Sequence, residues 1–175
     1  MAILLLKKSY RHKDLKEIKF HDLWSSHGVF TTMRVIGKPA RILFFKNHLN
    51  TLLKSLKVYK INKKNIKKNI LKLIKLNISN KKKYDHLFRI ASNNKMISIS
   101  LRKRLRPKLN FNLKLVNYKR IDAEYKNLKY KKILSHLKYM DTSRSDIALF
   151  KDKNILETGT SNLLFFKKNK IYSPN

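Results

Sequence analysis

The stretch GVFTTMRVIGKPARILFFKNHLNTLLKSL, residues 28–56, indicates the fold because its hydrophobic period changes halfway along. β-Branched and aromatic residues dominate its start, and Gly37 with Pro39 forms a turn signal before a second apolar run. These features predict a β-hairpin in which VFTTMRV turns into RILFF. From His48 the apolar residues lie on one helical face, at Leu49, Leu52, Leu53, Leu56 and Tyr59. An amphipathic helix should therefore follow the hairpin.

Further helices and strands are expected downstream. Asn62 can cap a second helix, whose inward residues are Ile66, Ile70, Leu73 and Ile74. The apolar patterns predict strands at 2–6, 86–91, 96–102, 111–116, 147–150 and 163–166, and a third helix over 130–137. The polar, charged run 117–126 is the expected boundary between two lobes.

Composition narrows the class of protein. A chain of 175 residues suits one domain or two small lobes. Cysteine is absent, so disulfides, thiolate catalysis and cysteine-bound metals are excluded, and the six histidines lack zinc-like spacing. No apolar run approaches the roughly 18 residues of a membrane span, and the start does not have the layout of a signal peptide. We expect a cytoplasmic protein with no metal and no membrane partner.

The net charge of +33 invites a nucleic-acid interpretation. However, the lysines are spread along almost every segment and accompany many Asn and Ile residues, the pattern that A- and T-rich codons produce. The one dense basic cluster is Arg102–Arg106, which suits a solvated strand end, an anionic-substrate pocket or RNA. We therefore favour codon bias and expect no nucleic-acid partner.

Another unusual stretch is ETGTSNL, residues 157–163, which places a carboxylate beside a glycine and two hydroxyls in a chain with only three glycines. Together with residues 28–56, NLKYKKIL at 127–134, DIALF at 146–150 and KIYSPN at 170–175, it completes an ordered set of motifs. This set resembles the class IV aminotransferases, fold-type IV enzymes that use pyridoxal 5'-phosphate. The family includes branched-chain and D-amino acid aminotransferases and aminodeoxychorismate lyase.

The resemblance implies an α+β fold of two lobes. The N-terminal lobe would comprise residues 1–117, a connection 118–126, and the start of an incomplete barrel-like lobe 127–175. Members of this family pair as homodimers, so a homodimer is implied. Because the chain stops where the family begins its phosphate-binding loop and helix, we expect a fragment or a truncated homologue with doubtful activity of its own.

The resemblance also implies roles for individual residues. Lys129 would be the Schiff-base lysine, and Glu157 would partner the pyridine nitrogen of the cofactor. Thr160 and Ser161 would lie at the rim of the cofactor site. From composition alone, the alternatives are a solvated lysine and a polar surface turn.

Residues of the hairpin would face the substrate. Phe30 stands where the family keeps an aromatic residue, and Arg34 lies on the same strand face, where it or Arg102 could bind the substrate carboxylate. Their alternative is a core aromatic and an edge charge. Thr51 occupies the position of the family arginine that binds the cofactor phosphate, so nearby Lys54 or another arginine would have to compensate.

The expected function is transfer of an amino group between an amino acid and a 2-oxo acid. The sequence FTT at 30–32 resembles aminodeoxychorismate lyase, which releases 4-aminobenzoate, and keeps that reaction open. Two other hypotheses are a non-catalytic basic protein that binds RNA and an inactive remnant that binds no cofactor.

Overall fold

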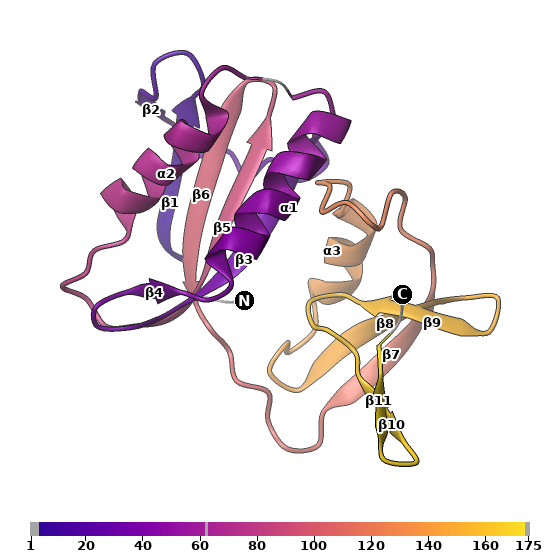
Figure 1. Cartoon of the computed structure of the whole chain (residues 1–175). Coiled ribbons are helices and arrows are strands. Elements are labelled where there is room, and N and C mark those ends of the chain that lie inside the picture. The colour runs from indigo at the N-terminus through magenta and orange to yellow at the C-terminus, as the bar shows by residue number, and fades with distance from the viewer. Residues whose placement is uncertain (1–3, 62, 174–175) are drawn as a thin grey trace. The chain divides into compact units, whose positions relative to one another are not determined.

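The structure is a computed structural model that describes residues 4–61 and 63–173. It divides into two compact units (Figure 1). The larger unit comprises the described residues up to Arg104 together with Glu124–Lys129, and the smaller one comprises Leu105–Ala123 with the described residues from Tyr130 onward. The first boundary between the units lies after Arg104. The lobe limits expected from the sequence stay a prediction.

An antiparallel sheet forms the framework of the larger unit. Its strands are β1 (Leu4–Arg11), β2 (Glu17–Ile18), β3 (Gly28–Gly37), β4 (Arg41–Ile42), β5 (Tyr84–Asn93) and β6 (Met96–Lys103). They lie in the order β2-β1-β6-β5-β3-β4. The expected pairing of the segments 86–91 and 96–102 is confirmed, because β5 and β6 pair in register from His86 with Lys103 to Ser92 with Ile97.

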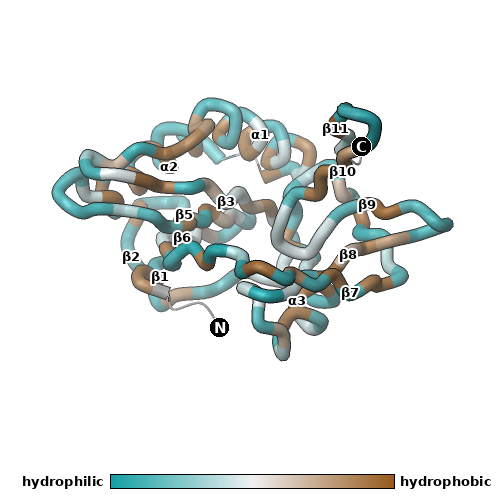
Figure 2. The backbone as a smooth tube through the Cα atoms, turned by 90° about the horizontal axis from the view of Figure 1, so that it is seen from below, coloured by the Kyte–Doolittle hydropathy of each residue, from teal (hydrophilic) through white to brown (hydrophobic). Residues whose placement is uncertain are grey.

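Two helices, α1 (Phe45–Val58) and α2 (Ile66–Asn77), cover one face of this sheet (Figures 1 and 2). Every second residue along each strand faces these helices, which is the period-2 pattern of a sheet covered on one side. The shared core includes Met33, Leu52, Ile70, Phe88, Ile90 and Ile99. The residues between them point to the other face of the sheet and include the polar cross-strand neighbours Thr32, Arg89 and Ser100.

The predicted hairpin and helix are correct in kind but not in their limits. Phe44 and Phe45 were expected in the returning strand, yet β4 ends at Ile42 and α1 already begins at Phe45. Phe44 adopts a left-handed conformation with φ 50°, which ends the extended chain and starts the helix. The cap expected for α2, Asn62, lies outside the described residues, and α2 begins after Asn65.

A three-stranded sheet forms the smaller unit from β7 (Asn112–Asn117), β8 (Ser145–Lys151) and β9 (Asn154–Thr158). β7 and β8 are parallel, so the chain must cross over between them, and α3 (Lys131–Leu137) lies in that crossover. Ile133 of α3 packs with Val116, Ile147 and Leu149 in a small core. A hairpin of β10 (Phe165–Lys167) and β11 (Lys170–Tyr172) follows. The motifs had not predicted β9 or β11.

Candidate active site

The segment that leads to Lys129 is hydrogen-bonded along the start of β3. The Phe30 amide donates to the Lys126 carbonyl at 2.7 Å, and the Leu128 amide donates to the Gly28 carbonyl at 2.9 Å. Leu128 itself is fully buried, and its carbonyl accepts from the Ser25 amide at 2.8 Å. These hydrogen bonds along the edge of β3 therefore fix the backbone immediately before Lys129.

Lys129 ends the larger unit. Its amide donates to Oδ1 of Asn127 at 3.0 Å, and Asn127 is fully buried, so the local backbone is constrained. The Lys129 side chain is exposed. Nucleophilic lysine chemistry requires an amine that an aldehyde can reach, and the exposed side chain of Lys129 extends from a constrained backbone.

Gly28 provides a test of this anchoring. A Cβ added there would lie 2.4 Å from the Ser92 carbonyl oxygen and 2.7 Å from Cδ1 of Leu128. We expect Gly28→Ala to push the segment off β3 and lower the free energy of unfolding of the larger unit by about 1–3 kcal/mol, measured by urea denaturation. Gly37→Asn is the matched control, since φ is +79° there and asparagine tolerates that conformation. Equal midpoints for Gly28→Ala and wild type would contradict the anchoring.

The predicted substrate residues Phe30 and Arg34 lie on β3. Phe30 packs edge-on against Trp24, with ring centroids 4.9 Å apart. Arg34 forms an ion pair with Asp85 at 3.1 Å, so part of its charge is already matched. Their roles toward a substrate stay a prediction.

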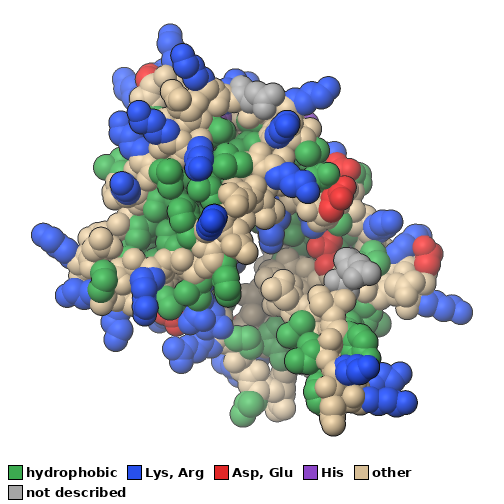
Figure 3. All heavy atoms as spheres, in the orientation of Figure 1, with side chains coloured by type: hydrophobic (Ala, Val, Ile, Leu, Met, Phe, Trp, Pro, Cys, Tyr) green, Lys and Arg blue, Asp and Glu red, His purple; other side chains and the backbone are tan. Residues whose placement is uncertain are grey.

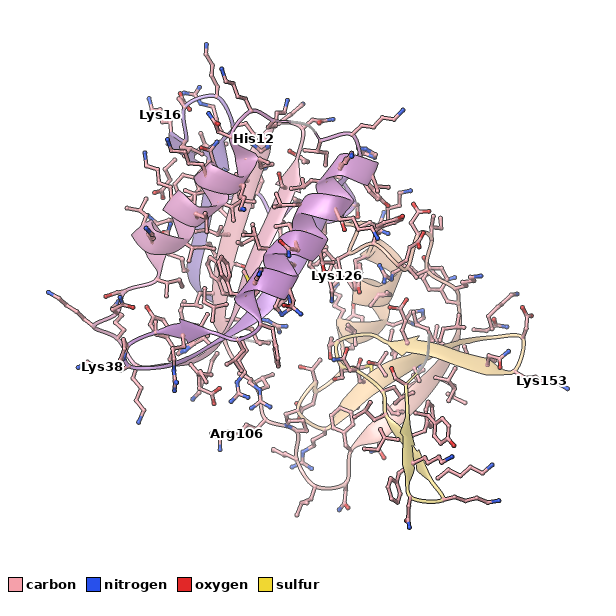
Figure 4. All side chains as sticks on the ribbon, in the orientation of Figure 1. His12, Lys16, Lys38, Arg106, Lys126 and Lys153 are labelled. Atoms are coloured by element: carbon pink, nitrogen blue, oxygen red, sulfur yellow. The ribbon has the colours of Figure 1, made fainter. Side chains whose placement is uncertain are left out.

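His48 on α1 lies close to this edge of the sheet. Its Nδ1 is 3.1 Å from Oγ1 of Thr31. Burial lowers the pKa of His48, and the charge of Lys126, which lies beside α1 in Figure 4, lowers it further. The neutral imidazole is therefore the favoured form at neutral pH.

The polar face of the sheet holds two arginines. Burial lowers the pKa of Arg102, the third predicted substrate residue. Its neighbour Arg89 was not predicted: its guanidinium lies 4.2 Å from the Trp24 ring centroid and pairs with Asp22, while its Nε is buried without a hydrogen-bond partner among the described residues. The sequence could have indicated Arg89 because it is a charged residue inside the predicted strand 86–91. The ion pair with Asp22 offsets part of the cost of burying this cation.

Glu157 lies on β9 opposite Leu149, and its side chain is 26% exposed. Arg120 grips it with two parallel hydrogen bonds, from Nε to Oε1 at 2.9 Å and from Nη2 to Oε2 at 3.1 Å. The Arg120 side chain is only 5% exposed. The motifs indicated Glu157 but not Arg120, which lies in the polar connection after β7, where a single arginine gives no sequence signal.

The fully buried Asp146 accepts hydrogen bonds from the turn after Glu157. Its Oδ2 accepts from the Thr160 amide at 3.0 Å and from the Thr160 hydroxyl at 2.8 Å. The Ser161 amide donates to Oγ1 of Thr158 at 3.1 Å. Gly159 fits closely, since a Cβ there would lie 2.7 Å from Oδ1 of Asp146. These polar groups therefore stabilise the turn, and cofactor contacts by Thr160 and Ser161 stay a prediction.

Thr51 is exposed on α1, where it could donate one hydrogen bond but supplies no charge. Within residues 4–61 and 63–173, no group of three or more His, Asp or Glu residues could hold a metal ion. The helices of that same part of the chain are too short or too polar to cross a membrane. Figure 3 shows Lys and Arg side chains scattered over the visible face, without one dominant basic patch.

The motifs noted in the sequence lie on β3 and α1, on the segment before α3, and on β8 and β9. A model of the family "Amino-transferase class IV" matches residues 28–175. The chain therefore belongs to the class IV aminotransferase family, as its motifs had indicated. No curated protein matches it significantly.

Solved structures that are 10–17% identical to this chain support the α+β fold of the family. A proposed 4-amino-4-deoxychorismate lyase has a TM-score of 0.67 and 17% identity, over 86% of this chain and 65% of that one. The branched-chain aminotransferase of the archaeon Thermoproteus uzoniensis, solved with norvaline, has 0.66 and 13%, over 95% and 67%. A hypothetical aminotransferase from Mycobacterium tuberculosis in its PLP-bound form has 0.61 and 12%, over 91% and 68%. The chain thus spans about two thirds of the length of these proteins.

Proposed function

We propose that this chain provides the lysine and the carboxylate of a pyridoxal 5'-phosphate enzyme that transfers an amino group between an amino acid and a 2-oxo acid. The family match, which spans residues 28–175 and so includes Lys129 and Glu157, is the observation that carries the proposal. When bound, the cofactor supplies an electron-withdrawing ring that stabilises negative charge on the substrate carbon.

The residues present fit this cofactor. A carboxylate offers about four lone-pair positions, and the Arg120 fork occupies only one on each oxygen of Glu157. Glu157 is partly exposed, so it can still accept from a protonated ring nitrogen. Lys129 would hold the cofactor covalently and carry a proton, and Thr51, Thr160 and Ser161 would donate to its polar groups. Phe30, Arg34 and Arg102 would contact the substrate.

The test is covalent trapping of the cofactor on the purified chain. The protein is mixed with pyridoxal 5'-phosphate, reduced with borohydride and mapped by peptide mass spectrometry, beside Lys129→Ala. We expect one stoichiometric label at Lys129 that the variant lacks. Lys126→Ala is the matched control, since this exposed lysine lies in the same segment. Label scattered equally over surface lysines in all three proteins would overturn the proposal and favour an inactive remnant.

Aminodeoxychorismate lyase activity is a second candidate, because the sequence 30–32 and one similar structure point to it. It would use the same lysine. Incubation with aminodeoxychorismate separates the two reactions: 4-aminobenzoate with pyruvate would indicate the lyase. Amino transfer to a 2-oxo acid without 4-aminobenzoate would indicate the aminotransferase. A homodimer and a cytoplasmic location remain part of the proposal.

A further inference from the structure

We infer that Arg120 is a positioning residue, which holds the Glu157 carboxylate in a fixed orientation and couples it to the start of α3, directly after Lys129. This inference rests on the proposed function. It concerns a residue that the motifs do not include, and all contacts that carry it lie within the smaller unit.

The first step is the geometry of the fork. Two parallel N–H···O bonds of 2.9 and 3.1 Å fix both oxygens of Glu157, whereas a single bond would leave the carboxylate free to rotate. The same Nη2 also donates to the Ala123 carbonyl at 2.7 Å, and this hydrogen bond fixes the guanidinium in turn. The carboxylate is therefore oriented by a group that is itself held.

The second step is burial. The Arg120 side chain is 5% exposed and the Glu157 side chain 26% exposed, so water screens this pair far less than a surface ion pair. Burial lowers the pKa of Arg120, but the hydrogen bonds to Glu157 and the nearby Tyr130 and Tyr118 outweigh it and raise the pKa overall. Arg120 is thus permanently charged, and the carboxylate has a constant partner.

The third step connects the pair to the lysine. Tyr130, the residue at the start of α3, lies with its ring centroid 5.1 Å from the Arg120 guanidinium carbon. Burial raises the pKa of Tyr130, so its phenol stays neutral near pH 7. Because Tyr130 follows Lys129 in the chain, one guanidinium holds both the carboxylate and the neighbour of the lysine.

The experiment measures cofactor binding rather than turnover. Apparent affinity is obtained from the fraction of Lys129 labelled at increasing pyridoxal 5'-phosphate, and the pH midpoint of the visible absorption band is recorded for the same proteins. We expect Arg120→Gln to weaken the affinity by about tenfold or more and to move the pH midpoint. Arg120→Lys, which keeps the charge but not the fork, should fall between Arg120→Gln and wild type. Arg144→Gln, at an arginine of the same unit whose side chain is 64% exposed, is the matched control.

The possible outcomes separate the two proposals. A wild-type chain without Lys129 label would overturn the proposed function and this inference with it. Lys129 label in wild type, with unchanged affinity and pH midpoint in Arg120→Gln, would overturn the inference alone. If Arg120→Gln does not fold, as judged by circular dichroism, Arg120→Lys decides: an intermediate affinity supports the positioning role, and wild-type affinity with an unmoved midpoint refutes it.

Discussion

Replacing Phe88 with alanine is expected to lower the free energy of unfolding of the larger unit by about 3–5 kcal/mol. Phe88 is fully buried at the middle of β5, and its cross-strand neighbours Met33 and Leu101 are also buried. The substitution removes the ring and leaves a cavity that the helices above can fill only in part. It should therefore be the most damaging change in this core.

Trp24 makes the measurement specific, because it is the only tryptophan and it belongs to the larger unit. Its fluorescence is followed in a urea titration for wild type and variant. Leu76→Ala serves as the control, since Leu76 is 68% exposed on α2. Its free energy of unfolding should differ from wild type by no more than about 0.5 kcal/mol. A loss of less than about 1 kcal/mol for Phe88→Ala would show that the sheet and the helices are not packed as described.

The core around Phe88 was predictable from the sequence because its pattern is local. Apolar residues alternate in β5 and β6 and recur at helical spacing in α1 and α2, so each segment specifies its own buried face. The limits were less predictable. Phe44 and Phe45 have strand-forming side chains, and it is the left-handed backbone of Phe44 that ends the strand.

The site shows the opposite balance. Glu157 was found because it belongs to a motif, and a motif is read from neighbouring residues. Arg120 is 37 positions away in sequence and Asp146 is 11 positions away, so their contacts with Glu157 and its turn depend on how β7, β8 and β9 pair. Asp146 lies within the motif DIALF, but nothing in that run indicates a carboxylate that accepts from Thr160. Long-range polar contacts of this kind become visible only in the structure.

The turn beyond Glu157 leads to the second large effect. We expect Asp146→Ala to lower the stability of the smaller unit by about 2–4 kcal/mol, because the amide of buried Ile147 and the amide and hydroxyl of Thr160 lose the acceptor that this fully buried carboxylate provides. Asp146→Asn should cost less, since the amide oxygen can replace one carboxylate oxygen. Lys151→Ala, an exposed change on the same strand, should stay within about 0.5 kcal/mol of wild type.

Hydrogen exchange by NMR or mass spectrometry, combined with urea denaturation, distinguishes a local from a general effect. In Asp146→Ala the amides of Thr160 and Ile147, which both bond to this carboxylate in wild type, should exchange faster than those in the middle of β8. Because β9 ends at Thr158, loosening this turn frees the strand end that carries Glu157. Unchanged protection of Thr160 would mean that the buried carboxylate does not hold the turn, and that the close fit of Gly159 against Ile147 suffices to position Glu157.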